Sequence, residues 1–171
     1  PEMIANVEKE LAREMKLMGV HVSFSPVADV NNNPANPVIN DRSFGEDREL
    51  VARKAIAYMK GLQQGGVIAT AKHFPGHGDT DTDSHLGLPL IAQTRARLDS
   101  LELYPFERMV SEGLSAMMVG HLEVPALDTN PGMPSTLSRH VVSDLLETEL
   151  GFKGLVFTDA LNMKGVANAD K

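Results

Sequence analysis

Apolar residues three or four positions apart predict a helix in each of five stretches of the chain, and glycines follow several of these stretches. Short apolar runs rich in valine, isoleucine and phenylalanine lie between the stretches and predict strands. The helices are expected at about 4–18, 51–62, 95–112 and 138–150 and from 163 onward. The strands are expected near 20–25, 67–73, 115–121 and 155–159.

Short strands that alternate with helices indicate parallel βαβ units in an α/β fold. Both a doubly wound open sheet and a barrel fit this alternation, and both bind ligands at the carboxyl ends of the strands. Polar residues follow the predicted strands at these ends, namely Asp29, Lys72, His73, His121 and Asp159. The first strand lacks a glycine-rich phosphate loop, which disfavours nucleotide binding. Four units are half of an eight-stranded barrel.

Composition limits the possible partners. The chain has 171 residues, 42% of them hydrophobic, which suits one globular domain. A net charge of −7 argues against nucleic acid as a partner, and the absence of cysteine excludes thiolate chemistry. No apolar run approaches the roughly 18 residues that a membrane span needs. Because the chain starts at Pro1 without methionine or a signal-peptide pattern, we expect it to be part of a larger protein.

The segment KHFPGHGDTDTDSH, residues 72–85, concentrates titratable side chains in one loop. His73 and His77 are four positions apart, as in helical zinc sites, but the Pro-Gly pair between them prevents a helix. The alternating Asp79, Asp81 and Asp83 resemble part of a calcium loop that lacks its glycine and its terminal glutamate. A hydrated turn held by side-chain hydrogen bonds is the simplest alternative.

General acid–base chemistry is a third interpretation of this loop. Asp83 can accept a hydrogen bond from one ring nitrogen of His85, which leaves the other nitrogen to exchange protons near neutral pH. Lys72 and His73 would then donate hydrogen bonds to a polyhydroxylated ligand. Asp159, at the end of the apolar run LVFT, is a candidate nucleophile, and the alternative for it is an N-cap of the next helix.

The loop resembles the signature of glycoside hydrolase family 3, in its β-N-acetylhexosaminidase branch. Three further regions are similar to that family in the same order, so the resemblance covers essentially the whole chain. They are SPVADVNNNPANPVINDRSFGED (25–47), MVGHLEVPALD (118–128) with PSTLSRHVVSDLLETELGFKGLV (134–156), and FTDALNMKGV (157–166).

The resemblance implies part of a TIM-type (β/α)8 barrel and a retaining hydrolase that removes terminal β-N-acetylglucosamine without a cofactor or metal. Asp159 matches the family's nucleophile, which forms a covalent glycosyl-enzyme intermediate. His85 matches the general acid/base of this branch, oriented by Asp83. A histidine in this role departs from the usual pair of carboxyl groups.

Substrate-binding residues are implied in the same way. Arg42, Lys72 and His73 match residues that hydrogen-bond the sugar hydroxyls, and His121 matches a histidine that lines the site. Asn33 and Asn36 are expected to shape their loop rather than touch substrate. The glycines of residues 75–78 are expected to act as hinges that let the catalytic loop close over the sugar.

Several alternatives stay open from sequence. A family 3 β-glucosidase or an N-acetylglucosaminide phosphorylase would share most of these residues, and a metal-dependent hydrolase or a non-catalytic sugar-binding domain are further possibilities. We take residues 1–171 as a single incomplete catalytic domain whose partner is the remainder of its own barrel. Produced alone, it is expected to be inactive or poorly folded. Cytoplasm and periplasm of a bacterium both remain open, as do cell-wall fragments in peptidoglycan recycling and chitin oligomers as substrates.

Overall fold

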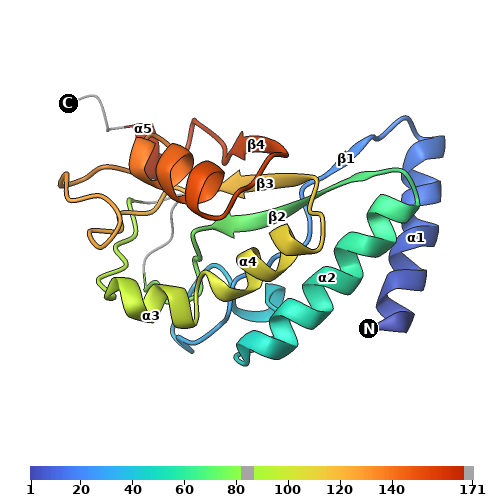
Figure 1. Cartoon of the computed structure of the whole chain (residues 1–171), viewed down its shortest axis with the longest axis horizontal. Coiled ribbons are helices and arrows are strands. Elements are labelled where there is room, and N and C mark those ends of the chain that lie inside the picture. The colour runs from blue at the N-terminus through green and yellow to red at the C-terminus, as the bar shows by residue number, and fades with distance from the viewer. Residues whose placement is uncertain (82–86, 168–171) are drawn as a thin grey trace.

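The computed structural model describes residues 1–81 and 87–167, which form a parallel sheet with helices packed against it (Figure 1). All four predicted strands are confirmed, and so are the predicted helical regions up to residue 150. The helical region 95–112 forms two helices, and the second begins next to Pro105. The elements are α1 (Glu2–Leu17), β1 (Val22–Ser23), η1 (Asn40–Arg42), α2 (Arg48–Gln64), β2 (Ile68–Phe74), α3 (Arg95–Ser100), α4 (Tyr104–Ser111), β3 (Ala116–Val119), the π-helix η2 (His140–Glu149), β4 (Leu155–Thr158) and α5 (Lys164–Ala167).

The strands lie in the order β1-β2-β3-β4, and each pairs in parallel with the next strand along the chain. A doubly wound sheet reverses its strand order at a switch point, whereas a barrel adds consecutive strands in one direction. The observed order therefore favours the barrel over the open sheet.

The sheet is strongly curved. In a flat sheet, three strand spacings of about 4.8 Å would separate β1 from β4 by roughly 14 Å. Instead the ring of Phe24, directly after β1, meets the ring of Phe157 in β4 with 5.3 Å between centroids. Side chains from the two outer strands therefore meet over one concave face, as expected for part of a TIM-type barrel.

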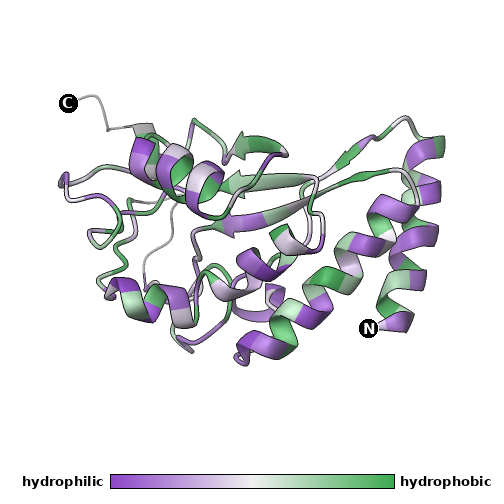
Figure 2. Cartoon of the chain, in the orientation of Figure 1, coloured by the Kyte–Doolittle hydropathy of each residue, from purple (hydrophilic) through white to green (hydrophobic). Residues whose placement is uncertain are grey.

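The helices cover the other face of the sheet. Ala69 and Ala71 of β2 and Met117 of β3 belong to a buried apolar cluster that includes Leu62 of α2 and Phe106 of α4. Helix α1 lies along α2 at the blue end of the chain (Figure 1). Figure 2 shows the sheet strands β3 and β4 as mainly hydrophobic, while α1 and α2 carry hydrophilic outer faces. This layering holds the carboxyl ends of the strands at one edge.

Strand β4 differs from β3 in its exposure. Every residue of β3 is buried, whereas Leu155 and Val156 of β4 are 52% and 36% exposed. Leu161, shortly after β4, is 62% exposed. No helix among residues 1–81 and 87–167 is long and apolar enough to cross a membrane.

Candidate active site

Charged side chains from distant parts of the sequence gather at the carboxyl ends of the strands. Lys72 lies in β2, Asp159 directly follows β4, and Asp29 and Arg42 lie in the long connection after β1. Burial lowers the pKa of the Lys72 ammonium and the Arg42 charge lowers it further, while Asp159 and Asp29 act in the opposite direction. Because all three groups influence Lys72, the four side chains form one electrostatic cluster.

Asp29 has no exposed surface, and its carboxylate joins the connection after β1 to the end of β2. It accepts hydrogen bonds from the backbone N–H of His73 at 3.2 Å and of His77 at 2.7 Å. Its Oδ2 also lies 2.8 Å from Nδ1 of His73. Burial raises the pKa of Asp29, but the charge and the hydrogen bond of His73, with help from His77, outweigh it and hold the pKa below its usual 3.8.

The ionised Asp29 fixes the tautomer of His73. A carboxylate only accepts hydrogen bonds, so the neutral His73 ring carries its proton on Nδ1 and presents the lone pair of Nε2. The sequence interpretation treats His73 as a donor to the ligand; the neutral Nδ1–H tautomer would instead accept a hydrogen bond from a hydroxyl, while the imidazolium would donate one. Sequence reasoning noted Asp29 as a strand-end residue and gave it no role. Its position directly after the apolar run VA was the available signal.

Asn36 locks two loops together. Its Nδ2 donates to the carbonyl oxygens of His77 and Gly78 at 2.8 and 3.1 Å, and its Oδ1 accepts from the N–H groups of Val38 and Ile39. The side chain is buried and therefore shapes more than its own loop. It ties the connection that carries Arg42 to the loop after β2.

The glycines after β2 are close-packing positions. A Cβ on Gly78 would lie 1.7 Å from the carbonyl oxygen of Val30, and one on Gly76 would lie 2.9 Å from Cβ of Glu102. Residues 75–78 are buried. Glycine is therefore needed at both positions because atoms of Val30 and Glu102 occupy the space that a side chain would take, while the hinge role stays a prediction.

Replacing Gly78 by alanine is expected to destabilise the protein by at least about 3 kcal/mol, because a Cβ cannot rotate away from a backbone carbonyl. The matched variant G113A adds its methyl group to open space at a positive φ of 87°. It should cost only about 1 kcal/mol of backbone strain. Denaturant unfolding of both variants measures the difference, and equal losses would contradict the close-packing explanation.

His77 is buried beneath the cluster. Its Nδ1 lies 2.8 Å from Oγ1 of Thr80, and its ring meets that of His73 edge-on. Burial lowers the pKa of His77 below its ordinary 6.5; the Asp29 charge opposes this shift and the His73 charge adds to it. The folded protein therefore binds a proton at His77 less readily than the unfolded chain does.

This shift predicts a pH-dependent stability. Below about pH 6.5 the unfolded chain protonates His77 while the folded protein resists, so stability falls as the pH falls, by up to about 1.4 kcal/mol per pH unit. The loss continues until the pH reaches the lower pKa of the folded state. In H77Q this contribution disappears, so its stability should change less between pH 7 and pH 5. Identical slopes for wild type and H77Q in denaturant unfolding would contradict the assignment.

A metal site would require a cluster of ligand side chains. Residues 1–81 and 87–167 contain no group of three or more His, Cys, Asp or Glu side chains able to hold a metal ion. Asp79, one of the alternating aspartates, accepts a hydrogen bond from Gln93 at 2.8 Å and lies 4.0 Å from Arg97. Asp83 and His85, the predicted acid–base pair, lie outside the described residues.

Asp159 is held by the turn that follows β4. Its backbone N–H donates to Val119 of β3 at 3.0 Å, and its Oδ1 accepts from the N–H of Ala160 at 2.8 Å. Helix α5 begins at Lys164, too far along the chain for Asp159 to be its N-cap. The carboxylate is half-buried and faces the same edge as Lys72.

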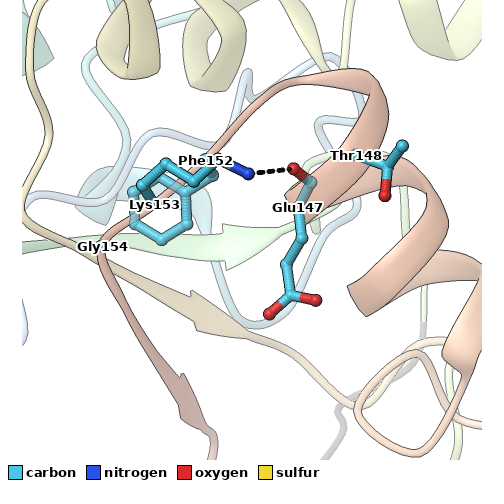
Figure 3. A pocket seen from close by; sticks show the side chains of 5 residues that line it. All are labelled: Glu147, Thr148, Phe152, Lys153 and Gly154. Atoms are coloured by element: carbon cyan, nitrogen blue, oxygen red, sulfur yellow. Dashed lines mark hydrogen bonds between the residues drawn. The ribbon is translucent and has the colours of Figure 1, made fainter.

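A hollow of about 520 Å³ lies elsewhere, at the beginning of β4 (Figure 3). Glu147 and Thr148 at the end of η2 line it together with Phe152, Lys153 and Gly154, which lead into the strand. The Lys153 ammonium donates to the Glu147 carbonyl oxygen at 3.4 Å. This end of the strand is opposite the end that carries Asp159, so the hollow is separate from the charged cluster.

Comparison with known proteins identifies the family. The model for the glycosyl hydrolase family 3 N-terminal domain matches residues 1–171. The chain belongs to glycosyl hydrolase family 3. The β-hexosaminidase A of Pseudoalteromonas piscicida is 38% identical over 172 residues, covering 95% of this chain and 29% of that protein.

Two solved structures, one of them named as a family 3 enzyme, show the same architecture. The β-N-acetylglucosaminidase of Paenibacillus sp. str. FPU-7 is 44% identical with a TM-score of 0.95, covering 97% of this chain and 31% of that chain. The β-glucoside phosphorylase BglX bound to 2FGlc is 29% identical with a TM-score of 0.92, covering 98% and 32%. The chain thus spans less than a third of each of these proteins, and its four parallel strands are consistent with part of a family 3 N-terminal barrel domain.

Proposed function

We propose that this protein is a retaining glycosidase that removes terminal β-N-acetylglucosamine from the non-reducing end of glycans. The observation that carries the proposal is the cluster of Arg42, Lys72, Asp159 and the Asp29–His73 pair at the carboxyl ends of a family 3 barrel. The 44% identity to a family 3 β-N-acetylglucosaminidase supports this sugar. Peptidoglycan fragments and chitin oligomers both end in it, so both are substrates to assay.

The cluster suits the stabilisation of a glycosyl transition state. The Asp159 carboxylate attacks the anomeric carbon and forms the glycosyl-enzyme intermediate, which water then hydrolyses. Arg42 and Lys72 donate hydrogen bonds to the sugar hydroxyls, and Nε2 of His73 accepts one. The protein thereby orients the sugar before any bond changes.

The acid–base role is proposed for His85, with Asp83 as its orienting partner, and both lie outside the described residues. In the first step the imidazolium protonates the leaving oxygen, and in the second the neutral ring takes a proton from the attacking water. Residues 75–80, packed against Asp29 and Asn36, give this segment a firmly held starting point at the site.

A phosphorylase is the second candidate, because BglX, 29% identical, is named a β-glucoside phosphorylase. Phosphate would replace water as the acceptor and would release a sugar 1-phosphate. Product analysis with and without phosphate separates the two functions: a hydrolase releases free N-acetylglucosamine in both cases.

Trapping tests the mechanism directly. A 5-fluoro N-acetylglucosaminyl fluoride slows breakdown of the intermediate, and peptide mapping then locates the label. We expect label on the peptide that contains Asp159. Label on another residue would overturn the nucleophile assignment, and no label together with turnover would point to a different mechanism.

We also propose that further strands continue the sheet beyond β4 in the active protein. The exposed Leu155 and Val156 leave an apolar edge strand, and the Pseudoalteromonas and Paenibacillus relatives are more than three times as long as the matched segment. The 171-residue chain produced alone should therefore show no hydrolysis of p-nitrophenyl N-acetyl-β-glucosaminide. Robust turnover by the isolated chain would contradict this proposal.

A further inference from the structure

His121 is completely buried at the end of β3, and both of its ring nitrogens contact the protein. Nε2 lies 3.0 Å from the carbonyl oxygen of Ala160. A carbonyl only accepts, so Nε2 carries the proton. Nδ1 of the neutral ring then accepts from the Thr136 hydroxyl, 2.8 Å away. A direct hydrogen bond from His121 to a sugar would have to replace one of these contacts.

The contact with Ala160 reaches the nucleophile. The N–H of Ala160 donates to Oδ1 of Asp159 at 2.8 Å, while its carbonyl accepts from His121. Hydrogen bonds therefore run from the Thr136 hydroxyl through His121 and the Ala160 backbone to the carboxylate. Among the residues that the structure describes, the Asp159 carboxylate has no other hydrogen bond.

Packing alone does not hold this turn. Ala160 and the neighbouring Leu161 are exposed, and β4 is the exposed edge of the sheet. Within the turn, Ala160 also accepts from the N–H of Met163 at 3.1 Å. His121 supplies a side-chain bond from the buried β3 to the residue beside the nucleophile.

We propose that His121 is a positioning residue for the nucleophile and that Thr136 fixes the tautomer it needs. This inference rests on the proposed function of Asp159. With the Nε2–H tautomer, His121 holds the Ala160 peptide, and the peptide holds one carboxylate oxygen. With the other tautomer, the Nε2 lone pair would face the Ala160 carbonyl and the turn would lose its anchor.

A matched pair of variants at Thr136 tests the inference in the purified active enzyme. T136V keeps the shape and removes the hydroxyl, whereas T136S keeps the hydroxyl. The fluorinated N-acetylglucosaminyl probe measures attack by Asp159 as a rate of inactivation. We expect about tenfold slower inactivation in T136V, with unchanged probe binding, and a nearly wild-type rate in T136S, because only carboxylate placement changes.

Nitrogen NMR of the His121 ring gives a second readout. The wild type and T136S should show the Nε2–H tautomer, and T136V should show a mixture. H121Q, whose amide can still donate to Ala160, should lose less inactivation rate than H121F.

The outcomes separate the two proposals. Absence of label on Asp159 in the wild type would overturn the proposed function, and this inference with it. A labelled wild type with equal inactivation rates in T136V and T136S would overturn the inference alone. So would a T136V defect confined to probe binding, since that result would place His121 against the substrate.

Discussion

Replacing Asp159 by alanine should lower kcat/KM for p-nitrophenyl N-acetyl-β-glucosaminide by at least about 10³-fold, because the covalent step loses its nucleophile. The cations of the cluster remain, so binding of N-acetylglucosamine should persist. Asp159 opposes the lowering of the Lys72 pKa, and its removal should lower that pKa further. Steady-state kinetics measures the loss of kcat/KM, and calorimetry with the free sugar measures the retained binding.

Added azide provides the decisive control for D159A. A small anion can enter the space that the carboxylate leaves and attack the same face of the sugar. We expect azide to restore p-nitrophenol release and to yield the α-glycosyl azide. D144A removes an exposed carboxylate from η2 and should leave activity unchanged. A D159A enzyme with a tenth or more of the wild-type activity would contradict the assignment.

Local sequence patterns predicted the elements well, because each strand is a short apolar run bounded by glycine or proline. They could not order the strands, since alternating helices and strands fit an open sheet and a barrel equally. The barrel is favoured by the strand pairing and by the contact between Phe24 and Phe157, which lie at opposite edges of the sheet.

The site was predictable where topology alone places a residue. Lys72, His73 and Asp159 end strands, so their shared edge followed from the parallel arrangement. Other roles depend on contacts between distant positions. Asp29 forms a hydrogen bond with His73, 44 positions away. Only glycine fits at position 78, because a Cβ there would clash with the carbonyl oxygen of Val30. A single sequence gives the residue types in such pairs but not the pairing, so the close packing of Gly78 against Val30 could not be predicted.

Replacing Asp29 by asparagine should destabilise the protein by about 2–3 kcal/mol, because two buried backbone N–H groups and the His73 ring lose a charged hydrogen-bond acceptor. The asparagine NH2 group would also face the N–H donors that the carboxylate now accepts from. His73 would respond by moving its proton to Nε2, which turns its acceptor toward the sugar into a donor. We therefore expect kcat/KM to fall by about 10- to 100-fold as well.

The pH dependence distinguishes this ionic role from simple packing. The pKa of Asp29 is lowered by folding, so its stabilisation is fully present above the ordinary value of 3.8 and is lost as the pH falls through the lower value of the folded state. The stability gap between wild type and D29N should therefore be widest near pH 7 and should narrow below about pH 3.8. D47N is the matched control, because Asp47 is an exposed N-cap whose oxygen accepts from the N–H of Leu50, and asparagine caps helices equally well. A gap of the same size at every pH would show that Asp29 contributes through shape and hydrogen bonding rather than through its charge.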